Sequence, residues 1–375
     1  MNDFLEDKEF EEHRKRHVER MERMRREKEQ QEQIRRKVKK VAPLVIGLVV
    51  LLVIAGITSG KDTVTKEEET QIQTEIPVTE TELPTETELI VEEGPKYEFV
   101  ETANTVDINT DYVISGNAVL VDATNNTIIA GRRAKERISP ASMTKVLTVL
   151  VAAEHITEEQ LDDTFTMTLE ITDYSFVNDC SCVGFLNEEV IPVRDLFYGT
   201  ILPSGADAAV GLASYVAGSH EAFVELMNEK LEELGLSGSA HFTNCVGLYD
   251  KEHFCTIYDM AVIMKAAMDN ELCREVLTTK YYVTTPTELH PEGLGISNWF
   301  LRRIEDKDSG GEVIGGKTGY VVQSRSCAVS YGIMENGREY ICATAGSSSS
   351  KNCINDHVAI YTKYVPEIDS PVGAE

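Results

Sequence analysis

An uncharged apolar run over residues 41–58 (VAPLVIGLVVLLVIAGIT) divides this chain into parts that cannot share one hydrophobic core. Its length is close to the roughly 20 residues that a helix needs to cross a bilayer. A basic cluster over 35–40 precedes it, so the positive-inside rule places residues 1–40 in the cytoplasm. The alternative, a cleaved signal peptide, has a shorter apolar region of about 7–15 residues. We therefore predict an uncleaved, single-pass transmembrane helix over 41–58, with the rest of the chain outside the cytoplasm.

The segments on either side of this run lack the apolar residues that a core requires. Residues 1–40 mix both charges, which is typical of a solvated helix. Residues 59–105 are rich in Thr and Glu, and chain entropy outweighs the little apolar surface that they could bury. We predict a disordered linker over 59–105, a folded domain over 106–366 and a short tail over 367–375.

The charge and the cysteines exclude several classes of function. A formal net charge of -27 argues against a nucleic-acid partner, because such a surface repels phosphates. The eight cysteines have neither the density of a disulfide scaffold nor the spacing of a zinc knuckle. Disulfides in an oxidising compartment stay open as an alternative, but we expect ordinary thiols. We predict neither a metal nor a cofactor.

Two pairs of strands are expected in the folded domain. The first is a strand–turn–strand at 118–121 and 128–130. The second joins strands at 327–333 and 339–345 through Asn336-Gly337, a strong hairpin signal.

Helical patterns lie between these strand pairs and after them. The run 143–153 is apolar nearly all round, which is typical of a helix buried on every side. Further helical patterns cover 193–217 and 220–235, and a last amphipathic helix ends near Val365. This order predicts an α/β (α+β) domain, with one mixed, mostly antiparallel sheet flanked by helices.

The tetrad Ser142-Met143-Thr144-Lys145 at the start of the buried helix is the first candidate for chemistry. Ser and Lys three residues apart lie on one face of a helix, within reach of each other. A serine hydroxyl needs an adjacent base, and a desolvated lysine with a lowered pKa can act as that base. Pro140 places Ser142 near the helix N-terminus, where free amides favour developing negative charge. The pattern alone is common, but an unpaired Lys145 on a buried helix would be costly.

Two further motifs supply polar groups later in the chain. Ser204-Gly205-Ala206-Asp207 begins another small-residue helix, and its hydroxyl is a candidate proton relay; alone it is an ordinary helix start. The stretch 315–319 (GGKTG) fits a strand whose small residues let another backbone lie close, although alone it also fits a turn. Lys317 and Thr318 offer a cation and a hydroxyl to a substrate carboxylate. The amide of Tyr320, with that of Ser142, is a candidate oxyanion hole.

Together and in this order, the motifs resemble the set S-x-x-K, S-x-N and K-T-G of penicillin-binding proteins and β-lactamases. Over about 117–365 the sequence resembles the low-molecular-mass, serine-type D-alanyl-D-alanine carboxypeptidases (peptidase family S11-like). The likeness includes PASMTK, LPSGADAA, FVELMNEKLEELGL, GGKTGY and the segment 244–259. It implies a β-lactamase/transpeptidase-like fold.

The resemblance also implies a mechanism and partners. Ser142 would be the acylated nucleophile, Lys145 its base and Ser204 the proton relay. The strand residues Lys317, Thr318, Gly319 and Tyr320 would bind the substrate. Water would hydrolyse the acyl-enzyme and release one D-alanine from peptidoglycan stem peptides, and β-lactams would inhibit by acylating the same serine.

The sequence departs from the family pattern at two positions. The middle motif has Ala206 where Asn is usual, which puts the rate in doubt, and Arg325 stands where the family tends to have a glycine. Ala206 is the best argument for the alternative, a catalytically weak or inactive member that acts as an envelope binding or regulatory protein. A β-lactamase is the third reading, but we find no glutamate in an E-x-x-L-N pattern after the middle motif.

Overall fold

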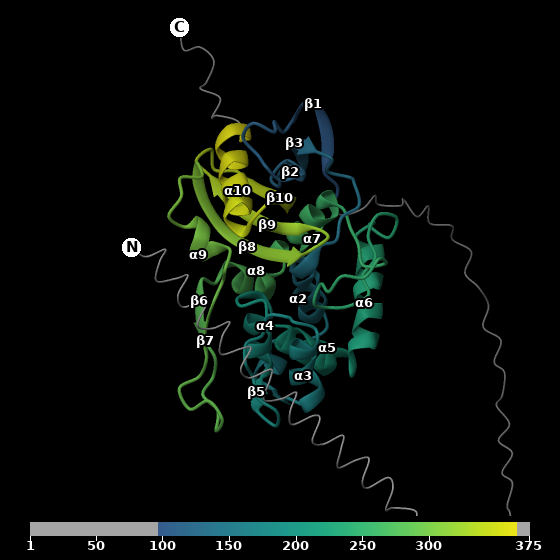
Figure 1. The fold of residues 1–375 in the computed structure, drawn as a ribbon, viewed down its shortest axis with the longest axis vertical. Coiled ribbons are helices and arrows are strands. Elements are labelled where there is room, and N and C mark those ends of the chain that lie inside the picture. Colours follow the sequence, from purple (N-terminus) through teal and green to yellow (C-terminus); the bar gives the residue numbers. More distant parts are fainter. Residues whose placement is uncertain (1–96, 366–375) are drawn as a thin grey trace, which may run out of the picture. The chain divides into compact units, whose positions relative to one another are not determined.

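The computed structural model describes residues 97–365, in which a central sheet carries helices on both faces and a helical lobe lies beside it (Figure 1). The strands of the central sheet are β1 Val100–Asp107, β2 Asn117–Asp122, β3 Thr127–Arg132, β8 Gly311–Val321, β9 Arg325–Met334 and β10 Glu339–Ser347. Two small pairs lie outside it: β4 Thr164–Thr166 with β5 Val190–Pro192, and β6 Tyr281–Val283 with β7 Gly295–Ser297.

The helices fall between the early and the late strands, with one more at the end. They are two 3-10 turns, η1 Ala141–Met143 and η2 Glu159–Asp162, and nine α-helices among the described residues: α2 Thr144–Glu154, α3 Leu169–Val177, α4 Val193–Ile201, α5 Ala206–Ala217, α6 His220–Glu233, α7 Ile257–Asp269, α8 Glu271–Thr278, α9 Leu301–Ile304 and α10 Ser350–Tyr364.

The central sheet has the strand order β1-β3-β2-β10-β9-β8. Only β1 and β3 pair in parallel, and the other four pairings are antiparallel, so the predicted mixed, mostly antiparallel sheet is confirmed. Both predicted strand pairs are present, and Gly337 in the β9–β10 turn has φ +73°, a conformation that glycine adopts without strain. The order places β8 at one edge of the sheet, paired with β9 alone.

Successive side chains of β2 point to opposite faces of the sheet and pack into two separate hydrophobic cores. Val119 and Val121 face the core shared with α2 and α7, whereas Ala118 and Leu120 face the one shared with α9 and α10. Figure 1 shows α10 lying across the sheet on the side opposite α7. The sheet is therefore covered on both faces, as the helical patterns predicted.

The helices agree with the sequence except at one break. Helix α2 is buried along nearly its whole length, as predicted. The pattern over 193–217 is two helices, α4 and α5, because Pro203 lacks an amide hydrogen and Ser204 has φ +63°, which no α-helical residue adopts. The interruption leaves Ser204 in the connection between them.

The folded part begins earlier than predicted. Strand β1 starts at Val100, inside the residues assigned to the linker, and pairs with β3. Phe99 anchors it, 3% exposed and edge-on to the ring of Tyr258 with the ring centroids 6.3 Å apart. The Thr- and Glu-rich composition masked this strand, because seven of its eight residues are exposed and it gains its pairing only from β3.

The predicted cytoplasmic segment 1–40, the transmembrane helix over 41–58 and the tail 367–375 lie outside the described residues. Within 97–365 no helix is long and apolar enough to cross a membrane. Six of the eight cysteines are buried, and four of these belong to the core shared with α2 and α7: Cys245, Cys255, Cys273 and Cys327.

The anchoring role of Phe99 leads to a stability prediction. We expect Phe99→Ala to lower the free energy of unfolding by about 3–5 kcal/mol, because it empties a buried aromatic site. Val100→Ala is the matched control: its side chain is 48% exposed, and the change should stay within about 0.5 kcal/mol. Urea denaturation of both variants measures the difference, and equal stabilities would show that β1 is not part of the cooperative fold.

Candidate active site

Ser142 and Lys145 meet at the start of the buried helix. The turn η1 leads directly into α2, and Lys145 Nζ lies 3.2 Å from Ser142 Oγ and donates a hydrogen bond of 2.7 Å to the carbonyl of Val246. Lys145 is only 2% exposed. Burial lowers its pKa to about 8, and the neighbouring Cys180, Cys245 and Asp207 oppose only part of that shift. A neutral amine is therefore accessible near physiological pH at hydrogen-bond distance from the serine.

A second lysine–serine pair lies beside the first. Lys317, on the edge strand β8, donates to Ser204 Oγ at 2.8 Å and to the carbonyl of Thr318 at 2.8 Å. Burial, and then repulsion by Lys145, hold the pKa of Lys317 well below its ordinary value. That repulsion links the two pairs electrostatically, and three separate segments of the chain thus supply one cluster of two amines and two hydroxyls.

Strand β8 passes close to the nucleophile candidate, as its small residues predicted. A Cβ at Gly319 would lie 3.0 Å from the backbone nitrogen of Ser142 and 2.8 Å from Cys327 Sγ. Thr318 is partly buried in the same strand, and the side chain of Tyr320 is 67% exposed. All seven predicted site residues therefore lie on η1 and α2, in the α4–α5 connection or along β8.

The loop after α6 holds the carbonyl that receives Lys145, and sequence reasoning assigned it no role. Asn244 Oδ1 accepts hydrogen bonds from the amides of Val246, Gly247 and Leu248, at 3.2, 2.7 and 2.9 Å. This arrangement fixes the carbonyl of Val246 against Lys145. A backbone acceptor has no residue signature, so only the fold reveals it.

A buried histidine supports the same turn from behind. His253 is 1% exposed, and its Nε2 lies 2.9 Å from Thr144 Oγ1. Its Nδ1 accepts the amide of Thr243 at 3.0 Å, which leaves the proton on Nε2 to bond Thr144. Burial lowers the pKa of His253 to about 3, so the ring is neutral and acts as a fixed bridge to Thr144, the residue before Lys145.

Asp207 fixes the wall beside the middle motif. Its carboxylate accepts the amides of Val183 and Gly184 at 2.9 and 3.0 Å, and burial raises its pKa. Ala206 is buried and brings no polar side chain to the position where the family pattern has an amide. The site thus retains its amines and hydroxyls but lacks that amide.

Gly247 is the tightest point of the site and yields a prediction. Its φ is +86°, and a Cβ there would lie 1.8 Å from the carbonyl oxygen of Ala141, next to Ser142. We expect Gly247→Ala to lower the free energy of unfolding by about 3 kcal/mol or more, since strain and overlap add. Gly238→Ala is the control, because nothing lies within 4 Å of a Cβ there. Denaturant unfolding measures the free energy of unfolding of both variants. Equal values for Gly247→Ala and Gly238→Ala would refute this close contact.

Comparison with known proteins agrees with this fold. Residues 102–348, more than half of the chain, match the model of the peptidase S11 family, described as D-alanyl-D-alanine carboxypeptidase. The D-alanyl-D-alanine carboxypeptidase DacF of Bacillus subtilis is 28% identical over 235 residues, 63% of this chain and 58% of DacF. DacC of Escherichia coli, also a D-alanyl-D-alanine carboxypeptidase, is 35% identical over 152 residues, 40% of this chain and 38% of DacC. The chain thus spans about half the length of these relatives.

Solved structures show the same architecture. The Streptomyces K15 DD-transpeptidase matches with a TM-score of 0.62 and 25% identity, over 68% of this chain and 98% of that one. The D-alanyl-D-alanine carboxypeptidase of Mycobacterium tuberculosis matches with a TM-score of 0.58 and 27% identity, over 66% and 89%. The predicted transpeptidase-like fold is thereby confirmed, and the chain belongs to the peptidase S11 family of D-alanyl-D-alanine carboxypeptidases.

Proposed function

We propose that this protein is a serine D-alanyl-D-alanine carboxypeptidase that removes the terminal D-alanine from peptidoglycan stem peptides. The observation that carries the proposal is the buried Lys145, whose pKa is lowered to about 8 and whose Nζ lies 3.2 Å from Ser142 Oγ. An amine in this state is a base matched to a serine nucleophile. Family membership supplies the substrate class.

Acylation begins with proton transfer to Lys145. Ser142 Oγ gives up its proton to Nζ and bonds to the carbonyl carbon of the penultimate D-alanine. The amides of Ser142 and Tyr320 donate hydrogen bonds to the developing oxyanion, an arrangement that the close approach of β8 to Ser142 supports. Ser204 relays that proton from Lys145 to the leaving nitrogen, the amide bond breaks, and D-alanine departs. Water then bonds to the ester carbon and gives one proton to the neutral Lys145, which passes it to Ser142 Oγ as the ester bond breaks.

Lys317 and Thr318 bind the free carboxylate of the substrate. Lys317 is buried without a carboxylate partner among residues 97–365, and Lys145 repels it. A substrate carboxylate supplies the missing negative charge and favours the ammonium form of Lys317. Because β8 is the edge strand, a substrate peptide in an extended conformation is able to lie along it.

The location that we propose follows from the sequence alone. Residues 41–58 anchor the protein as a single-pass membrane protein, with 1–40 in the cytoplasm and the catalytic domain outside, where peptidoglycan is found. Residues 59–96 then act as a spacer between the membrane and the folded part.

Ala206 favours a second function, an envelope protein that binds stem peptides without turning them over. An amide at this position would help to orient the base and the substrate, and alanine does neither. Against it stand the two intact lysine–serine pairs, with hydrogen bonds of 3.2 and 2.8 Å.

The first test is D-alanine release from a synthetic pentapeptide ending in D-Ala-D-Ala, using the purified full chain. We expect Ser142→Ala to lower the rate by at least about 10³-fold, because no nucleophile remains. Ser237→Ala, at an exposed serine outside the site, should leave the rate unchanged. A labelled penicillin should acylate the wild type and Ser237→Ala but not Ser142→Ala. Stoichiometric peptide binding without release would instead establish the binding function.

The lowered pKa of Lys145 sets the pH dependence of acylation. The rate should rise about tenfold per pH unit below about pH 8 and level off above it, because only the neutral amine accepts the proton. Lys145 and Lys317 interact, so the apparent pKa belongs to the pair.

The stability of the fold should also rise with pH. Lys145 binds its proton more tightly in the unfolded chain than in the folded one, so the free energy of unfolding rises between about pH 8 and 10.5.

Penicillin acylation rates between pH 6 and 10 measure this limb. Lys145→Arg keeps a cation that does not lose its proton, so residual acylation should show no limb near pH 8. The same limb in wild type and Lys145→Arg would assign the titration to another group.

A further inference from the structure

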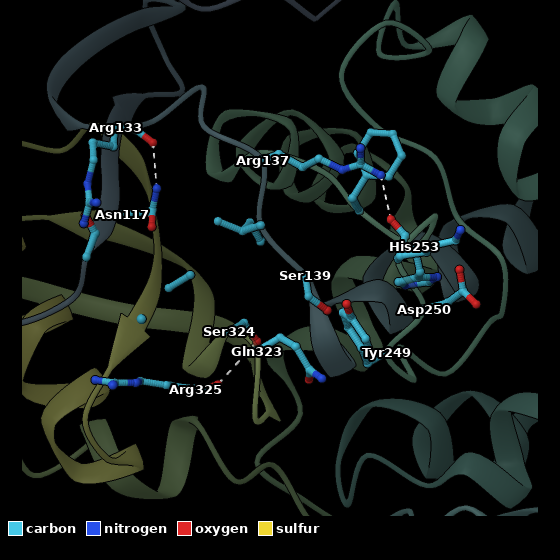
Figure 2. Close-up of a pocket in the computed structure, with 16 residues that line it drawn as sticks. Asn117, Arg133, Arg137, Ser139, Tyr249, Asp250, His253, Gln323, Ser324 and Arg325 are labelled. Carbon is cyan, nitrogen blue, oxygen red and sulfur yellow. Dashed lines mark hydrogen bonds between the residues drawn. The ribbon is translucent and has the colours of Figure 1, made fainter.

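A pocket of about 630 Å³ lies at the end of the sheet, next to the residues that precede Ser142. Its walls come from the start of β2, the turn after β3, the loop 249–254 and the β8–β9 turn, and Ser139 lies between them. Figure 2 shows Arg133, Asn117 and Arg325 on one side, Arg137 and His253 on the other. None of the seven catalytic and substrate-binding residues discussed above lines it, so the proposed mechanism does not account for it.

The pocket is cationic in a strongly acidic protein. Four cations line it, Arg133, Arg137, Lys251 and Arg325, against the single carboxylate of Asp250. Arg133 and Arg137 already have carboxylates, Glu136 at 3.8 Å and Glu252 at 4.0 Å.

Among the described residues, three polar groups at the pocket remain without partners. Within residues 97–365 no side chain pairs with the guanidinium of Arg325 or the ammonium of Lys251. The hydroxyl of Ser139 is buried and has no hydrogen-bond partner in that range either. Unpaired cations together with a buried, unsatisfied hydroxyl point to an anionic ligand.

The backbone supports a role for the Arg325 side chain. Arg325 has φ +53° and Arg133 has φ +45°, values that glycine adopts without strain but that cost free energy in other residues. The guanidinium of Arg133 donates two hydrogen bonds to the carbonyl of Gly116, at 2.9 and 2.5 Å, so that side chain stabilises the fold itself. Within residues 97–365 the Arg325 side chain has no such contact, so it is available to a ligand that binds from outside.

The direction in which the proposed substrate lies along β8 leads to this pocket. Lys317 receives the terminal carboxylate, Gly319 lies beside Ser142, and the chain continues to Gln323 and Arg325 at the turn. Gln323 is four positions beyond Gly319, about 13 Å of extended chain. The acyl part of a peptide lying along β8 with its free carboxylate at Lys317 therefore extends toward the pocket, and a few residues span the distance.

We propose that the pocket binds a carboxylate on the acyl part of the stem peptide, with Arg325 as its principal cation. The proposal rests on the proposed function and specifies its substrate. Two carboxylates have this chemistry: the α-carboxylate of a γ-linked D-glutamate, and the side-chain carboxylate of a diaminopimelate that precedes D-alanine.

Matched pentapeptides ending in D-Ala-D-Ala separate these sources. One pair differs only in a carboxylate or a carboxamide on the D-glutamate, and the other only in a carboxylate or a carboxamide on the diaminopimelate. For the full chain we expect kcat/KM to favour the acid by about fivefold in one of the pairs, and less in high salt, because the cation is exposed.

Two variants of Arg325 connect this preference to the pocket. Arg325→Gly should abolish the preference without lowering the Tm, because glycine suits a φ of +53°, and Arg325→Lys should keep part of it. Arg338→Gly removes an arginine in the turn between β9 and β10, away from the pocket, and should leave the preference intact.

Equal kcat/KM within both pairs, or a preference that survives Arg325→Gly, would overturn the proposal. If the pocket proposal fails in this way but D-alanine is still released from the carboxamide peptides, the proposed function remains supported. If no peptide is hydrolysed, the proposed function fails, and the Kd of each peptide for the Ser142→Ala full chain decides the pocket. The pocket proposal is supported if Ser142→Ala binds the acid peptide more tightly than its carboxamide and Ser142→Ala/Arg325→Gly does not. Equal Kd values for the acid and the carboxamide in Ser142→Ala refute it.

Discussion

The burial of Lys145 is the constraint on which the rest of the site depends. A lysine with 2% exposure at the start of an apolar helix is costly as an ammonium ion, and that cost lowers its pKa to about 8. The cost is tolerable because the carbonyl of Val246 and the hydroxyl of Ser142 satisfy Nζ. The same packing that makes the helix a core element therefore lowers the pKa of Lys145 and suits it to the proposed role of base. Exposing Lys145 would restore its ordinary pKa and remove its chemistry.

Holding that lysine requires a rigid frame assembled from distant parts of the chain. Asn244 ties three successive amides and so presents the Val246 carbonyl, while Gly247 and Gly319 let two backbones approach the turn before α2. Ala141 and Ser204 both have positive φ, 49° and 63°, next to the two hydroxyls. Such φ values cost free energy in residues other than glycine, so the surrounding structure must hold both positions.

The sequence predicted the parts of this site that have residue signatures. Ser142, Lys145, Ser204 and Lys317 were identified from three short motifs, and the buried helix and the two strand pairs from apolar periodicity. The Val246 carbonyl and the His253–Thr144 bridge were not predicted, because backbone acceptors and buried neutral histidines leave no pattern in one sequence. The helix break at Pro203 was signalled by the proline itself. Strand β1 was missed because its pairing with β3 is a tertiary contact that overrides a linker-like composition.

The two lysines also explain why the site is incomplete without an anion. Lys145 and Lys317 repel each other, and the buried carboxylate that acts on Lys145, that of Asp207, already accepts the amides of Val183, Gly184 and Ala208. Asp207 therefore holds the backbone at Val183 and Gly184 in place more than it neutralises the two lysine amines. A ligand that brings a carboxylate to Lys317 removes the charge deficit, whereas a neutral peptide end leaves it in place. The burial of two amines with too little negative charge between them thus supports the proposed selection of a free carboxyl terminus.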